Sequence, residues 1–128
     1  MSEVLAKISI GELLDKLSIL EIKKNKIKDK EKLKYIEDEY NILHLLSSDF
    51  LLDFTVRDYY NELSSINNEL WDIEDSIRIK ENNSEFDSVF IDLARKVYIT
   101  NDRRYEIKNK INKKTESSIQ EQKGYKYE

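Results

Sequence analysis

The sequence predicts an all-α fold, a single-domain antiparallel bundle of about four helices. Proline is absent and only two glycines occur in 128 residues, so long helices meet few residues that would break them. Apolar residues recur at spacings of three and four along most of the chain, the period of amphipathic helices. We expect helices near 9–28, 30–46, 56–82 and 85–116, a bundle over 1–117 and a loosely ordered polar tail over 118–128.

The first two helices are predicted from one start signal and one change of phase. Ser9 and Glu12 have the spacing of a capping box, so the first helix begins there. A second apolar stripe begins at Leu33, about 120° away from the first one, so one straight helix cannot carry both. We place the break near Asp29, which can cap a new helix. The two stripes are Ile10, Leu13, Leu17, Leu20, Ile27 and then Leu33, Ile36, Tyr40, Leu43.

The third and fourth helices follow an apolar connection over residues 47–54. Thr55 with Asp58, and Ser84 with Asp87, have the spacing expected at two helix starts. The third stripe repeats as a strict heptad, which predicts close antiparallel packing. The third stripe is Tyr59, Leu63, Ile66, Leu70, Ile73, Ile77, and the fourth is Phe86, Phe90, Leu93, Val97, Thr100, Arg104, Ile107, Ile111.

Composition excludes several classes of function. The chain has no cysteine and one histidine, which excludes disulfides and thiolate sites and argues against a histidine-rich metal site. Residues 1–8 lack the pattern of a signal peptide, and no apolar run approaches about 18 residues. The basic run over 23–34 contains no aromatic residues for base stacking, and the isoelectric point is near 5.2. We therefore expect a cytoplasmic protein without a nucleic-acid partner, membrane contact, bound metal or cofactor.

The fourth stripe contains polar residues where apolar ones are expected. Thr100 and Arg104 occupy seam positions, and Asn101 and Lys108 lie beside them. A buried arginine needs a partner, so we predict that Arg104 is largely buried and contacts a carboxylate on another helix. The sequence offers Glu21, Glu69 and Glu74 as that partner. The resulting polar layer is either an ion-pair network that sets helix register or a pocket that binds a ligand.

A second cluster lies on the third helix, where Trp71, Glu74 and Arg78 share one flank. It is either an interfacial tryptophan beside an i,i+4 salt bridge or a platform for a ligand. No catalytic residue can be assigned, and whether the protein is an enzyme stays open. The candidate ligand-binding residues from both clusters are Glu21, Glu69, Trp71, Glu74, Arg78, Asn101, Arg104 and Lys108.

Two carboxylate pairs, Glu12 with Asp15 and Glu69 with Asp72, resemble those that bind Mg²⁺ in all-α nucleotide pyrophosphatases. With 38% charged residues, such pairs arise often by chance. We therefore predict no metal site from them.

Three segments, GELLDKLSILEIK, ELWDIEDSIR and TNDRRYEIKNKIN, resemble a family of short bacterial proteins catalogued as a domain of unknown function. The pattern LW-x-x-ED-x-x-R with a later ND-x-x-x-x-I is also similar to a second uncharacterised helical family. The resemblance implies an all-helical domain and brings no activity. It adds candidate residues that overlap the polar layer: Asp15, Lys16, Glu21, Trp71, Glu74, Asp75, Arg78, Asn101, Asp102, Arg103 and Arg104.

Two hypotheses for function remain. Aliphatic residues away from the seams, Ile19, Ile22, Ile79 and Ile99, indicate a second contact surface. They favour a self-associating interaction or accessory module, a homo-oligomer that we expect to be a dimer. The alternative is a small enzyme or sensor that binds an anionic molecule, such as a sugar phosphate or nucleotide, at the polar layer.

Overall fold

The computed structural model describes residues 2–126 and confirms the predicted all-α fold of four helices. These are α1 (Ile10–Lys26), α2 (Lys30–Ser47), α3 (Phe54–Asn82) and α4 (Ser88–Lys114), with a short 3₁₀ helix, η1 (Phe50–Leu52), between α2 and α3. No strand occurs within the described range. Residues 1, 127 and 128 lie outside it, so the last two positions of the expected tail are not placed.

The first two helices begin at the predicted caps. The Ser9 hydroxyl accepts a hydrogen bond from the Glu12 amide at 3.0 Å. The Asp29 carboxylate accepts bonds from the amides of Glu31 and Lys32 at 2.9 and 3.2 Å. Each side chain satisfies amides that the first turn of a helix leaves without a partner.

The last two helices use other caps than the sequence indicated. Asp53, not Thr55, caps α3, because its carboxylate accepts bonds from the amides of Thr55 and Val56. Asp87, not Ser84, caps α4, accepting from the Phe90 amide. Ser84 has a φ of 54° and lies in the turn that ends α3.

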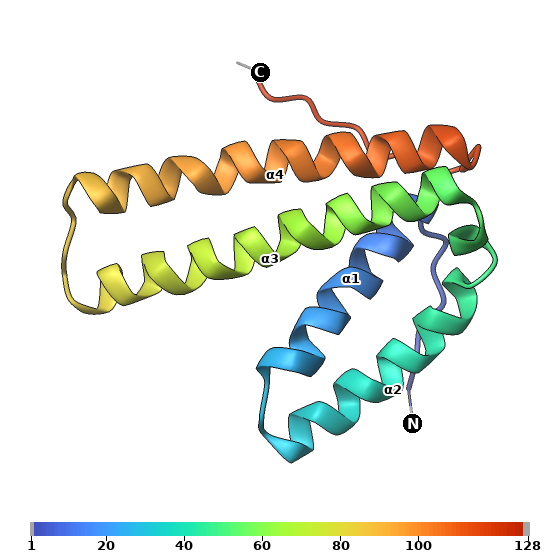
Figure 1. Ribbon diagram of the computed structural model, residues 1–128, viewed down its shortest axis with the longest axis horizontal. Helices are drawn as coiled ribbons and strands as arrows, with labels where there is room; N and C mark the ends of the chain where they lie inside the picture. Colours follow the sequence, from blue (N-terminus) through green and yellow to red (C-terminus); the bar gives the residue numbers. More distant parts are fainter. Residues whose placement is uncertain (1, 127–128) are drawn as a thin grey trace.

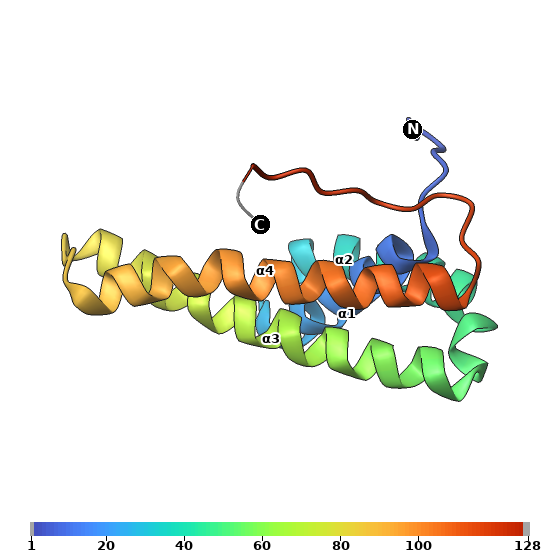
Figure 2. The same ribbon diagram turned by 90° about the horizontal axis from the view of Figure 1, so that it is seen from above.

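The helices form two antiparallel hairpins that cross at a wide angle. Figure 1 shows α1 and α2 as a short hairpin set obliquely against one half of a longer hairpin made of α3 and α4. The α1 helix packs against the other three helices. The other half of the long hairpin extends past the short one in both views (Figure 2).

The core lies where α1 meets the first half of α3 and the second half of α4. Its buried members include Leu14 and Leu17 of α1, Leu63 of α3, and Ile107 and Ile111 of α4. By contrast, none of residues 74–99 is buried. The apolar stripes of α3 and α4 are therefore covered only at the end of the long hairpin where α1 packs.

Two opposite faces of α1 are buried, whereas the sequence interpretation assigned it one. Besides the predicted stripe, Gly11, Asp15, Ser18 and Ile22 are buried. Their spacing of four, three and four places them on one face, which packs against the long hairpin. The expectation of exposed contact residues is therefore wrong for Ile22, which is buried, and for Ile19, which is half-buried. Ile79 and Ile99 are exposed as expected.

Gly11 allows α1 to approach α4 closely. Its amide donates a hydrogen bond to the Asn112 side-chain oxygen at 2.7 Å. A Cβ at this position would lie 2.6 Å from the backbone carbonyl oxygen of Lys108. That distance is shorter than any normal contact, so only glycine fits here without a shift of backbone.

The segment after α4 turns back and follows that helix (Figures 1 and 2). The Ser117 hydroxyl accepts a hydrogen bond from the Ile10 amide, and Tyr105 donates one to the Glu121 carbonyl. Lys123 forms an ion pair with Asp102 at 3.2 Å. Within the described residues, no helix combines the length and apolar character that a membrane crossing requires.

Candidate functional site

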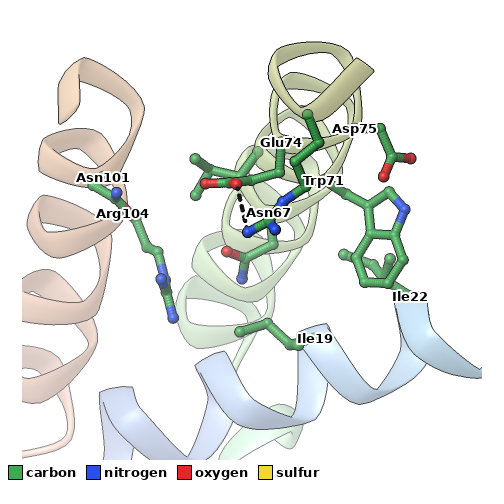
Figure 3. A pocket seen from close by; sticks show the side chains of 10 residues that line it. Ile19, Ile22, Asn67, Trp71, Glu74, Asp75, Asn101 and Arg104 are labelled. Carbon is green, nitrogen blue, oxygen red and sulfur yellow. Dashed lines mark ion pairs between the residues drawn. The ribbon is translucent and has the colours of Figure 1, made fainter. Parts of the chain in front are cut away.

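A pocket of about 470 Å³ opens where α1 diverges from the long hairpin. In Figure 3, α1 forms its floor, α3 one wall and α4 the other. Its lining combines an apolar part with amide and charged groups. The lining residues are Ile19, Ile22, Asn67, Leu70, Trp71, Glu74, Asp75, Arg78, Asn101 and Arg104.

Arg104 reaches from α4 across the pocket floor to Asp15 of α1. Its Nε donates to Oδ1 of Asp15 at 2.9 Å, and its Nη2 binds Oδ2. The Asp15 side chain is 1% exposed and that of Arg104 is 28% exposed. The hydrogen bond to Asp15 raises the pKa of Arg104 despite its partial burial. This two-point contact joins α1 to α4 beneath the pocket.

The partner of Arg104 is not among the carboxylates that the sequence offered. Arg104 does contact a carboxylate on another helix, as predicted, but the three named partners are wrong. Glu21, Glu69 and Glu74 each bond to other side chains. Arg104 pairs with Asp15 because α1 has a second buried face, and this face points Asp15 toward α4. The repeated spacing of Gly11, Asp15, Ser18 and Ile22 was the signal for this face.

Asn67 of α3 completes the pocket floor and was missed by sequence reasoning. Its amide nitrogen donates to Oδ1 of Asp15 at 2.9 Å and to the Ser18 hydroxyl at 2.7 Å. The Asn67 residue is 4% exposed, so the network holds it in one orientation. Both bonds use its nitrogen, and its oxygen faces the α4 side of the pocket (Figure 3). That oxygen keeps its capacity to accept a hydrogen bond.

Lys108 lies one helical turn beyond Arg104 and does not belong to the lining of the pocket. Its Nζ is 2.7 Å from Glu12, 3.1 Å from Glu121 and 3.9 Å from Asp15. Burial lowers the pKa of Lys108, but the bond to Glu12 and the charges of Asp15 and Glu12 outweigh it, so its pKa is raised. Lys108 therefore supports the floor through its contact with Asp15.

Glu21 and Glu69 also lie outside the pocket. Glu21 accepts hydrogen bonds from the hydroxyls of Tyr60 at 2.8 Å and Tyr40 at 3.4 Å. Burial and the bond to Glu21 raise the pKa of Tyr60 well above its ordinary value. Glu69 pairs with Arg103 at 3.1 Å on an exposed surface. Of the eight predicted binding residues, the other five line the pocket: Trp71, Glu74, Arg78, Asn101 and Arg104.

The α3 wall of the pocket joins an aromatic surface to a pair of charges. Trp71 is half-buried and lies over Ile22 (Figure 3). One turn along, Glu74 and Arg78 form an ion pair at 3.4 Å, with their side chains 42% and 77% exposed. Such an exposed pair is weak, so both groups remain available to a ligand.

The groups on the pocket floor are fixed by hydrogen bonds to one another. The Asp15 carboxylate is occupied by Arg104 and Asn67, which makes it a structural anchor. The Asn101 side chain lines the pocket from α4, and its amide can both donate and accept. The pocket thus presents hydrogen-bonding groups on a fixed floor beside an indole.

Two carboxylate pairs resembled magnesium-binding pairs; in the first, both side chains contact cations, and in the second, Glu69 pairs with Arg103. Glu12 contacts Lys108 and Lys16, and Asp15 contacts Arg104. Over residues 2–126, no group of three or more His, Cys, Asp or Glu side chains is arranged to hold a metal ion.

Comparison with known proteins identifies a family for this chain. No curated protein and no solved structure matches it. The model of the Family of unknown function (DUF6165) matches residues 4–128, which confirms the resemblance to a family catalogued as a domain of unknown function. Because the match covers nearly the whole sequence, the chain belongs to this family.

Proposed function

We propose that this domain is a binding module for a small molecule with one anionic group and a flat, partly apolar body. The main support for the proposal is the pocket floor, whose buried polar side chains are fixed by hydrogen bonds to one another. Asp15, Ser18 and Asn67 are at least 96% buried and hold Arg104 and one another in place. Above them, several hydrogen-bonding groups are left for a ligand, as in most sites for small molecules.

The charges of the lining favour a ligand with a single anionic group, such as one phosphate, over a polyphosphate. Arg78 and Arg104 supply two guanidinium groups, while Glu74 and Asp75 supply two carboxylates. Asp15 already neutralises Arg104, so a highly charged anion has little to balance it. The Trp71 indole provides a surface for a sugar ring or a base. A sugar phosphate and a nucleotide are therefore the two ligand classes to test first.

Trp71 makes the test direct, because it is the only tryptophan in the chain and it lines the pocket. Its fluorescence can be followed while inorganic phosphate, glucose 6-phosphate or AMP is added. We expect a saturable change with at least one organic probe and a weaker response to phosphate alone. If none of the three probes changes Trp71 fluorescence at millimolar concentration, the proposed ligand class is wrong.

A matched pair of variants distinguishes binding in the pocket from attraction of the anion to surface charge elsewhere. Arg78→Gln removes a guanidinium from the pocket, and Arg103→Gln removes one from the exposed pair with Glu69. A charge-assisted hydrogen bond contributes about 1.5–3 kcal/mol, so Arg78→Gln should weaken binding about tenfold or more. Arg103→Gln should leave it unchanged. Equal effects of the two variants would show that the anion does not bind in this pocket.

Self-association is a second candidate function, and it does not exclude the first. It is supported by exposed apolar side chains on the part of the long hairpin that α1 does not cover. Phe86, Tyr98 and Ile79 are each more than half exposed there. Exposed apolar side chains gathered in one region favour contact with another protein surface.

A further inference from the structure

The uncovered part of the long hairpin, residues 74–99, has the sequence pattern of a helix pair that packs against further helices. We call this segment the distal hairpin. Its seam residues Ile77, Phe90, Leu93 and Val97 are only half-buried. A two-helix hairpin leaves such residues partly in water, because no third element covers them.

One face of the distal hairpin continues the surface on which α1 packs. On α4, Phe90, Ala94, Val97, Asn101 and Arg104 follow one another at spacings of four, three, four and three, so they share a face. At one end of this stripe Arg104 binds Asp15 of α1. Toward the turn, α4 itself extends beyond the short hairpin (Figure 1). The face is therefore suited to another helix pair.

We propose that a second copy of this chain covers this face, with the two distal hairpins antiparallel about a two-fold axis near Ser76. The length of α3 that the short hairpin does not cover supports this position of the axis. The face is open from about Trp71, which lies over Ile22, to the end of α3 at Asn82. A second copy whose turn reaches Trp71 places the axis midway, between residues 76 and 77. A parallel arrangement would bring both short hairpins to the same place on the interface.

The charges on this face independently indicate an axis at Ser76, within one residue of that position. Glu74 and Arg78 lie two residues on either side of Ser76. In an antiparallel pair, Glu74 of each copy therefore lies opposite Arg78 of the other. Both side chains are exposed and belong to the face that lines the pocket. The pattern is complementary to itself only in the antiparallel orientation.

The residue at the crossing point on α4 is small. The α3 helix ends at Asn82 and α4 begins at Ser88. Ser76 lies six residues before the end of α3, and Ala94 lies six residues after the start of α4, so the two residues are at the same level along the hairpin. A small side chain at a crossing allows two helices to approach closely. The turn of the second copy would then lie beside Trp71 and close the open side of the pocket. This pairing rests on self-association but not on ligand binding.

Charge reversal tests the pairing. Sedimentation equilibrium of the whole chain at micromolar concentration should give twice the 15.3 kDa mass of one chain. Arg78→Glu or Glu74→Arg alone should weaken the dimer at least tenfold, because like charges then face each other. An equimolar mixture of the two single variants, and the double variant with both reversals, should each restore it. Trp71 emission should shift to shorter wavelength as the dimer forms.

The outcomes separate two kinds of failure. A wild-type protein that sediments only at 15.3 kDa overturns self-association and the pairing together. A dimer that is unaffected by both single reversals and by Ala94→Arg overturns the pairing alone. Glu69→Arg is the matched control, since Glu69 pairs with Arg103 and does not line the pocket. It should leave the dimer intact, and circular dichroism of each variant confirms folding.

Discussion

Replacing Arg104 with methionine tests whether the ion pair beneath the pocket stabilises the fold. Arg104→Met keeps an apolar stem and removes the charge, which leaves the Asp15 carboxylate in place. Asp15 is 1% exposed, so its carboxylate lies away from bulk water and depends on neighbouring protein groups to compensate its charge. Breaking a buried pair costs about 3–5 kcal/mol. Asp15 keeps the Asn67 amide and has Lys108 at 3.9 Å, so we expect about 3 kcal/mol, the lower end.

The partner substitution Asp15→Leu should cost less, roughly 2 kcal/mol, because Arg104 borders an open pocket where water reaches it. The double variant replaces a buried ion pair with two apolar side chains. Such replacements are often neutral or stabilising. We therefore expect the double variant to lose roughly 2 kcal/mol less than the sum of the two single losses.

Urea unfolding followed by circular dichroism measures these differences in the free energy of unfolding. Arg103→Met is the control, because its pair with Glu69 is exposed and should contribute less than about 1 kcal/mol. Single losses that add to the double loss within about 0.5 kcal/mol would refute the pairing energetics. An Arg104→Met protein as stable as the wild type would instead indicate that the arginine is kept for binding at the expense of stability.

Three further changes have expected outcomes in the same unfolding assay. Gly11→Ala should destabilise the protein by about 1–3 kcal/mol, because the added Cβ meets a backbone oxygen, whereas Gly124→Ala, where the space is open, should have no effect. Tyr60→Phe removes the 2.8 Å bond to Glu21 and should cost roughly 1–2 kcal/mol; unchanged stability would show that water replaces this bond. The raised pKa of Lys108 means that its ion pairs stabilise the fold fully below about pH 10.4, the pKa of an unfolded lysine, and lose this effect as the pH rises through the folded value. Above that pH the wild type should therefore lose stability faster than Lys108→Met, and parallel losses would contradict this account.

Local residue spacing was enough to predict which parts of the chain are helical and which residues share a face. The stripes of α2 and α3 are read directly from spacing, and Ile36, Leu63 and Ile66 are buried as that spacing indicates. The caps at Ser9 and Asp29 also follow from local chemistry. These features depend on residues a few positions apart, so the sequence contains all the information that they need.

Five of the eight predicted binding residues line one pocket, and this too follows partly from periodicity. Trp71, Glu74 and Arg78 share a flank of α3 because they are three and four residues apart. Sequence reasoning could not tell which helix lies opposite that flank. It therefore grouped Glu21 and Glu69 with the pocket, although each faces a different neighbour.

The contacts made by each face of α1 could not be predicted from local spacing and are known from the packing of the helices. The helical period shows that Gly11, Asp15, Ser18 and Ile22 lie on one face of α1. It does not indicate the angle at which α1 crosses the neighbouring helices. The close approach at Gly11 sets α1 between α2 and the long hairpin, so two faces are buried and Asp15 meets Arg104. The oblique crossing also leaves residues 74–99 without cover and opens the pocket beside them. Contacts between distant segments depend on how whole helices pack, and this is why they are absent from local pattern.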